Sequence, residues 1–197
     1  YGTVKLASER AAVAFADEVP LTIVRPPMVF GERDVSALPL FQSAARGWHL
    51  GVRGSAQQRV SLVHVDDLAA GLISAAERGA RATTSVVDST GVYYLADEER
   101  PLVSELGGRI AAALGRGGAR AVAVPQSLLW LAALSSEAIA RLRDRKAILN
   151  LDKYREITGG SWICDVSKAT QALDWRVVQL DERLRQTAAW YRSAGWL

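Results

Sequence analysis

Residues 60–77 read Val-Ser-Leu-Val-His-Val-Asp-Asp-Leu-Ala-Ala-Gly-Leu-Ile-Ser-Ala-Ala-Glu, and they change from the period of a strand to that of a helix. Apolar and polar side chains alternate over residues 60–65, which predicts a β-strand. Asp66 and Asp67 stand where the N-cap of a helix belongs, and the alanine-rich run after them predicts a helix to about Glu77. A strand that passes directly into a helix is the repeating unit of α/β proteins.

Strands and helices continue to alternate on both sides of this stretch. The elements expected before it are a helix over 1–17, a strand over 19–24, a loop over 28–34, a helix from Ser36 to about Arg46, and an extended piece over 49–52. The strand over 19–24 must stop where Pro26 and Pro27 remove backbone donors. Residues 92–95 read as a further strand. We therefore expect an α/β architecture with parallel strands and helical crossovers up to about residue 96.

The second half of the chain has a different pattern. Helices are expected over 101–114, 126–142, 167–173 and 180–191, with one short strand over 121–124. Gly115, Gly117 and Gly118 read as a turn from helix to strand. We expect two domains, residues 1–98 with the alternating strands and helices, and residues 99–197 as a smaller, mainly helical lobe.

Composition excludes several classes of protein. The 197 residues include 24 basic and 21 acidic side chains, and a net charge of +3 is too small and too dispersed for a nucleic-acid partner. Cys164 is the single cysteine, which excludes internal disulfides and cysteine-based zinc sites, and no metal is expected. The longest apolar stretch, around residues 128–134, is too short to cross a membrane. A soluble protein of the reducing cytoplasm fits these features.

The chain opens with Tyr1-Gly2-Thr3-Val4-Lys5, which places a phenol and an ammonium group one helical turn apart on the same face. A nearby cation favours the phenolate, so Lys5 would lower the pKa of Tyr1 from its ordinary value of about 10. Enzymes that transfer hydride need such a proton carrier. On its own, however, this spacing is more often a surface pair. A chain that begins with Tyr1 inside a helical pattern also suggests that an upstream segment is missing.

Four segments in the same order strengthen the catalytic interpretation, because together they resemble the extended short-chain dehydrogenase/reductase family, also called the NAD-dependent epimerase/dehydratase family. Tyr1 to Lys5 with Ser8-Glu9 looks like the catalytic helix of that family, and residues 23–31 (Ile-Val-Arg-Pro-Pro-Met-Val-Phe-Gly) look like its nicotinamide-side strand and loop. Arg59 with residues 63–69 is similar to its strand-to-helix segment, and residues 93–96 resemble the next strand. The resemblance covers nearly the whole chain.

This resemblance implies a role for each matching residue. Tyr1 would be the catalytic acid and base, while Lys5 would lower its pKa and hydrogen-bond the nicotinamide ribose. Pro27, Met28 and Val29 would lie against the nicotinamide, although a plain proline stop after a strand is the competing interpretation. The residues that the resemblance places nearest a substrate are Phe30 and Arg59.

Two further residues have simpler interpretations. His64 sits between Val63 and Val65 at strand spacing, which is more typical of a packing histidine than of a catalytic one. Glu9 is expected to orient or solvate the first helix.

The chain also departs from the family pattern. The glycine-rich loop that binds the cofactor pyrophosphate should follow a first strand and open a helix, and no such order occurs here. We therefore expect the C-terminal half of a Rossmann-type doubly wound parallel sheet plus a small helical substrate lobe, with the N-terminal dinucleotide-binding half absent. Such a fragment should be inactive alone and should self-associate through the helix over 1–17 or through an exposed sheet edge.

The function that the resemblance implies is that of an NAD- or NADP-dependent oxidoreductase acting on a small-molecule carbonyl or carbinol substrate. The apolar stretch over 124–134 favours a branch like the hydroxysteroid dehydrogenases and dihydroflavonol reductases. Two alternatives stay open: a sugar-nucleotide epimerase or dehydratase, and a non-catalytic, dinucleotide-sensing regulatory protein. Retention of both Tyr1 and Lys5 favours an enzyme, since a sensor needs no proton carrier.

Overall fold

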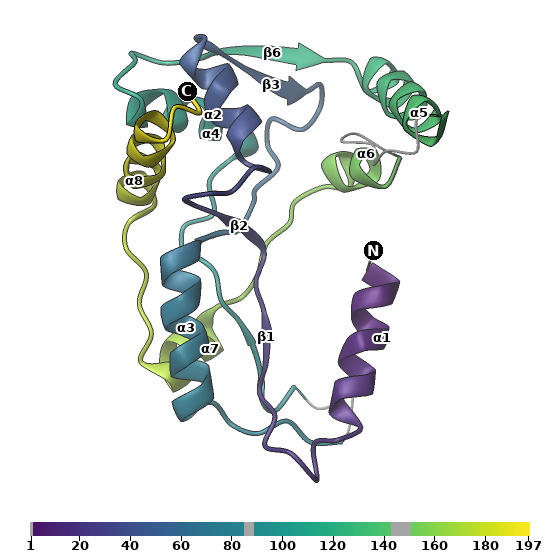
Figure 1. Cartoon of the computed structure of the whole chain (residues 1–197), viewed down its shortest axis with the longest axis vertical. Coiled ribbons are helices and arrows are strands. Elements are labelled where there is room, and N and C mark those ends of the chain that lie inside the picture. Colours follow the sequence, from purple (N-terminus) through teal and green to yellow (C-terminus); the bar gives the residue numbers. More distant parts are fainter. Residues whose placement is uncertain (1, 85–88, 143–150) are drawn as a thin grey trace. The chain divides into compact units, whose positions relative to one another are not determined.

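The computed structural model describes residues 2–84, 89–142 and 151–197 (Figure 1). Contacts divide the chain into two compact units, and each unit is assembled from three segments. The first unit comprises Tyr1–Gly31, Ser61–Arg100 and Ile163–Arg183; the second comprises Glu32–Val60, Pro101–Trp162 and Leu184–Leu197. These units are interleaved along the sequence, unlike the contiguous division at residue 98, which stays a prediction about functional domains.

The first unit has the predicted α/β character. Its elements are α1 (Gly2–Val13), β1 (Ile23–Arg25), β2 (Met28–Phe30), β4 (Leu62–His64), α3 (Val65–Arg78), β5 (Val92–Tyr94) and α7 (Ser167–Leu173). Strand β1 pairs with β5 and β2 pairs with β4, and both ladders are parallel, as expected from the alternation of strands and helices. Ile23 lies opposite Val92, and Phe30 lies opposite His64.

Strand β2 corrects the prediction of a loop over residues 28–34. The prolines at 26 and 27 have no backbone N–H, so they end the ladder that β1 forms with β5. From Met28 onwards the backbone again has its donors, and the chain pairs with β4 instead. One extended segment thus changes neighbours at its two prolines.

The start of α3 also differs from the prediction. His64, rather than either aspartate, is the N-cap, since its Nδ1 accepts a hydrogen bond from the Asp66 N–H at 3.3 Å. Asp66 and Asp67 therefore lie in the first turn, where negative charge is favourable to a helix. The Asp67 carboxylate accepts two hydrogen bonds from the guanidinium of Arg183, one of them from Nε at 2.9 Å.

The core of the first unit lies between its sheet and helices α3 and α7. Its buried members are Val63, Ala75, Tyr93, Leu95, Ala169, Leu173 and Trp175. The Trp175 indole donates from Nε1 to the Asp67 carbonyl at 2.8 Å, which fixes the ring over α3. Gly71 permits this close approach, because a Cβ there would lie 2.9 Å from Trp175 Nε1 and 2.7 Å from Leu95 Cδ1.

The second unit contains α2 (Leu38–Ala45), β3 (Trp48–Val52), α4 (Val103–Ala113), β6 (Arg120–Val124), α5 (Gln126–Leu142) and α6 (Leu151–Thr158). Helix α8 (Leu180–Ser193) starts in the first unit and belongs to the second from Leu184 onwards. Strands β3 and β6 pair in parallel from Trp48 to Val52. Helix α6 was not predicted.

The predicted cap of α2 was wrong. Ser36 does not cap this helix, because the Asp34 carboxylate accepts hydrogen bonds from the Ser36 N–H at 2.7 Å and the Ala37 N–H at 3.0 Å. The α2 helix then begins at Leu38. Asp34 lies two and three residues before these N–H groups, and at that spacing an aspartate side chain can bond the backbone without strain.

Tyr191 anchors α8 in the second unit. Its ring is buried, lies edge-on to Phe41 with centroids 5.0 Å apart, and stacks on Trp196 at 5.7 Å. Its hydroxyl donates to the Asp34 carbonyl oxygen. Burial, followed by the charges of Asp34 and Glu32, raises the pKa of Tyr191 to about 12.

We predict that Gly71→Ala destabilises the protein. Alanine adds about 1 kcal/mol of helix propensity, but overpacking against the hydrogen-bonded Trp175 ring costs about 1–3 kcal/mol, so a net loss is expected in urea unfolding. Gly108→Ala in α4 is the matched control, because a Cβ there meets no atom within 4 Å. That control should gain up to about 1 kcal/mol. Equal gains in both variants would show that Trp175 does not restrict Gly71.

Tyr191 should make stability depend on pH in the alkaline range. Because its pKa is raised in the fold, its contribution is complete below about pH 10 and is lost as the pH rises towards 12. We expect the free energy of unfolding of the wild type to fall by about 2 kcal/mol more than that of Tyr191→Phe between pH 10 and pH 12. Parallel pH profiles of the two proteins in denaturant titrations would contradict this assignment.

Candidate functional site

Helix α1 is held on the first unit by an ion pair. The Arg25 guanidinium, at the end of β1, donates from Nε to Glu9 Oε2 at 3.0 Å and from Nη2 to Glu9 Oε1. The hydrogen bond with Glu9 raises the pKa of Arg25 further above its ordinary value. The expectation that Glu9 orients the first helix therefore has a concrete partner.

Tyr94 completes this junction from the neighbouring strand. Its hydroxyl accepts a hydrogen bond from Arg25 Nη1 at 3.0 Å, and the guanidinium carbon lies 5.6 Å from its ring centroid. Arg25 thus connects α1, β1 and β5 through one planar group. The sequence analysis missed this role, although the i, i+4 spacing of Lys5 and Glu9 shows that both face the same side of α1.

The ion pair joins α1 to the carboxyl end of β1, since Arg25 is the last residue of that strand. In Figure 1, α1 descends from the N-terminus while β1 ascends. Lys5 precedes Glu9 by one turn of α1, about 6 Å along the axis. Ligands of open α/β sheets bind at this end of the strands.

The residues predicted to meet the nicotinamide lie on or beside β2. Pro27 and Val29 are half-buried, and Met28 is exposed. Phe30 is buried and packs edge-on against His64, with centroids 5.3 Å apart, which makes it a core residue as the structure stands. His64 is likewise buried, in agreement with the packing role predicted for it.

Gly31 ends this segment with a close approach to the next strand. A Cβ at Gly31 would lie 2.6 Å from Val65 Cγ1, and its φ of +149° is one that other residues rarely adopt. The turn after β2 can therefore pass tightly over the start of α3.

The other predicted site residues are not part of this cluster. Arg59 belongs to the second unit, where it is exposed and its backbone N–H donates to Ser161 Oγ at 3.0 Å. Tyr1 lies outside the described residues. Lys5, Pro27, Met28 and Val29 all belong to the first unit, and their role at a cofactor site stays a prediction.

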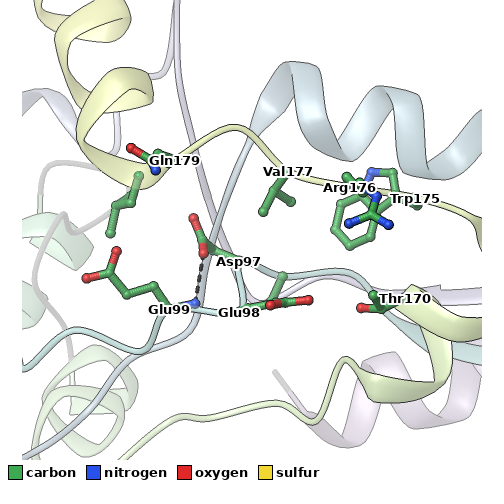
Figure 2. A pocket seen from close by; sticks show the side chains of 10 residues that line it. Asp97, Glu98, Glu99, Thr170, Trp175, Arg176, Val177 and Gln179 are labelled. Carbon is green, nitrogen blue, oxygen red and sulfur yellow. Dashed lines mark hydrogen bonds between the residues drawn. The ribbon is translucent and has the colours of Figure 1, made fainter.

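A pocket of about 320 Å³ lies elsewhere on the first unit (Figure 2). It is lined by residues 96–99 after β5, Thr170 of α7, residues 175–177, Gln179 and Leu180. Asp97 is buried at its wall, accepts the Glu99 N–H at 2.8 Å and donates its own N–H to the Leu62 carbonyl at 2.7 Å (Figure 2). Three carboxylates against the single guanidinium of Arg176 disfavour binding of a phosphate group there.

Comparison with known proteins shows which family and which relatives this chain resembles in sequence. The profile of the NAD dependent epimerase/dehydratase family matches residues 1–87. A curated protein of Caulobacter vibrioides named ceramide reductase is 32% identical over 97% of this chain, which spans 58% of the length of that relative.

Solved structures agree in fold. The UDP-glucuronic acid 4-epimerase of Bacillus cereus, in complex with NAD, is 15% identical with a TM-score of 0.66, over 98% of this chain and 52% of that one. The UDP-glucose 4-epimerase of Thermotoga maritima, with UDP-glucose, is 20% identical with a TM-score of 0.65, over 98% of this chain and 53% of that one. At these identities the likeness concerns the fold, and the chain spans about half of each structure.

We predict that Glu9→Gln loosens α1 from the sheet. The amide keeps the shape of the side chain but removes the charge, and a partly exposed pair of this kind contributes about 1 kcal/mol. Hydrogen–deuterium exchange should be faster over residues 2–13 in the variant than in the wild type. Glu18→Gln, at an exposed position after α1, is the control and should leave this exchange unchanged. Identical exchange in the two variants would mean that the ion pair does not hold the helix.

Proposed function

We propose that the chain, whose residues 1–87 match the NAD dependent epimerase/dehydratase family, belongs to an NAD- or NADP-dependent reductase of an apolar carbonyl compound. The observation that carries the proposal is the ion pair of Glu9 with Arg25, which fixes the helix that carries Lys5 at the carboxyl end of β1. The chain spans 58% of the curated relative, so the proposal concerns the activity of the whole protein.

The residues of the first unit fit the nicotinamide end of such a cofactor. Lys5 is exposed and can donate hydrogen bonds to a ribose hydroxyl. Residues 27–29 present an edge with an exposed Met28 and half-buried neighbours, against which a flat ring can lie. No group among the described residues fits the pyrophosphate, because Gly115, Gly117 and Gly118 follow α4 and precede β6, the reverse of a phosphate-binding loop.

The mechanism assigned to these residues is proton transfer coupled to reduction. A reduced nicotinamide, when bound, supplies hydride to the carbonyl carbon. The Tyr1 phenol donates a proton to the carbonyl oxygen as it gains negative charge, and takes a proton back in the oxidative direction. The Lys5 ammonium lowers the pKa of the phenol and so brings proton transfer closer to neutral pH. The Glu9 to Arg25 pair maintains the orientation of the helix that carries Lys5.

An apolar substrate is favoured by two observations. The curated relative is named a ceramide reductase, and ceramides are lipids with long alkyl chains. The second is composition, since residues 124–134 include no charged side chain. A hydroxysteroid or dihydroflavonol type of substrate is apolar as well.

A sugar nucleotide is the second candidate substrate. It is favoured by Arg59, which is exposed at the position that meets a substrate phosphate in sugar-nucleotide members of the family. It predicts epimerisation or dehydration of a nucleoside-diphosphate sugar, whereas the first candidate predicts consumption of reduced nicotinamide by a long-chain ketone. A non-catalytic dinucleotide sensor would do neither.

The test combines cofactor binding with turnover. NADH and NADPH should be titrated by fluorescence into the 197-residue chain and into the full-length protein, followed by assays with long-chain ketones and UDP-sugars. We expect saturable binding by the full-length protein and oxidation of the reduced nicotinamide with the ketones. Tight binding by the 197-residue chain alone would place the dinucleotide site within residues 1–197 and contradict the pyrophosphate argument above.

The catalytic assignment has its own variant. Lys5→Met should lower kcat of the full-length protein at least about 100-fold and move the pH optimum upwards, because the phenol loses the cation that lowers its pKa. Arg10→Met, an exposed cation on the same helix, is the matched control and should keep full activity. Full activity in Lys5→Met would refute the proposed mechanism, whichever substrate is used.

A further inference from the structure

Helix α5 presents an uncharged, mainly apolar face to solvent. Five large side chains on it are between 41% and 57% exposed: Leu128, Trp130, Leu131, Leu134 and Ile139. Ser127, Ala132 and Ser135 lie between them at helical spacing, and all three are exposed and uncharged. Ala133, on the opposite side, is fully buried. Among the exposed side chains that the structure describes on α5, none is charged.

A helix that is apolar on both its inner and outer faces is typical of a buried position. Here the outer face is continuous from Leu128 to Ile139, a length of about 16 Å at 1.5 Å per residue. Contiguous exposed apolar surface of this kind marks an interaction site in soluble proteins. The inner face is already occupied, since α5 packs on α6.

Charge identifies the kind of partner. The segments of the second unit contain 15 basic and 7 acidic residues, a formal charge of +8, whereas those of the first unit contain 9 basic and 14 acidic residues, a formal charge of −5. Arg116 and Arg120 are exposed, and they lie before β6 and at its first residue, at the end of that strand away from α5. A partner that covers α5 would therefore dock on a unit whose net charge is positive, although these two arginines are not beside the helix.

We propose that the outer face of α5 docks on the surface of a bilayer that contains anionic lipids. Leucine and isoleucine side chains would enter the acyl boundary, Trp130 would sit at the headgroup level where amphipathic rings are favoured, and the basic residues of the second unit would meet the lipid phosphates. A symmetric second copy is disfavoured, because it would bring two units of charge +8 together.

The helix would lie along the surface rather than across the bilayer. Over the described ranges 2–84, 89–142 and 151–197, no helix combines the length and apolarity that crossing a membrane requires. The inference does not depend on the catalytic assignment, because none of its residues belongs to the cluster around Lys5.

The test is flotation of the full-length protein with vesicles of phosphatidylcholine alone or with one quarter phosphatidylglycerol. We expect binding to the anionic vesicles, weaker binding in high salt, and little binding to the neutral ones. Leu131→Glu should weaken partitioning at least about tenfold, because it puts a charge on the face that enters the lipid. Leu72→Glu, on an exposed face of α3 in the acidic first unit, is the matched control and should bind like the wild type.

Two further measurements keep the result decisive. Leu128→Glu repeats the test if the first variant does not fold, as judged by circular dichroism. The blue shift of tryptophan fluorescence on adding anionic vesicles should disappear in Trp130→Phe. Binding that is unaffected by either glutamate variant would overturn the proposal. So would a dimer in light scattering that Leu131→Glu dissociates, which would assign this face to a second copy.

Discussion

Two adjacent prolines govern the arrangement of the first unit. Pro26 and Pro27 cannot donate to a ladder, so the extended segment that contains them bonds to β5 before the prolines and to β4 after them. The change of neighbour puts Arg25 at the last rung of one ladder and Phe30 at the last rung of the other. Arg25 binds Glu9 of α1, and Phe30 packs on His64, the residue that caps α3. The attachment of α1 to the end of β1 and the packing of Phe30 on His64 therefore both depend on the two prolines, which lack a backbone N–H.

Much of this arrangement could be predicted from local sequence patterns. Helices α5 and α7 have the predicted bounds, because long periodic segments with clear boundaries are decided by nearby residues. The parallel pairing of β1 with β5 and of β2 with β4 follows from the alternation of strands and helices. What could not be predicted depends on partners distant in sequence. Strand β2 is only three residues long and exists because β4 is available. The hydrogen bonds that Asp34 and His64 accept from nearby backbone are local, but spacing alone does not show which of several adjacent polar residues will accept them.

The candidate site shows the same division between local and distant information. The spacing of Tyr1 and Lys5 is visible in the sequence, but nothing local reveals that Arg25 and Tyr94 fix the helix that carries Lys5. The acidic pocket beside α7 was equally invisible, since Asp97 and Arg176 come together only through the packing of α7 on β5.

The interleaving of the two units has a consequence for how the chain acquires its structure during synthesis. The polypeptide passes from one unit to the other five times, after residues 31, 60, 100, 162 and 183. The first unit has all its segments only once residue 183 has been synthesised, and the second only with the segment from Leu184 onwards. Neither of these two units can therefore be completed before most of the other has also been synthesised. The nascent chain must keep the partly built core around Val63 and Tyr93 open until Leu173 and Trp175 arrive, a delay in which chaperones that shield apolar surface would act.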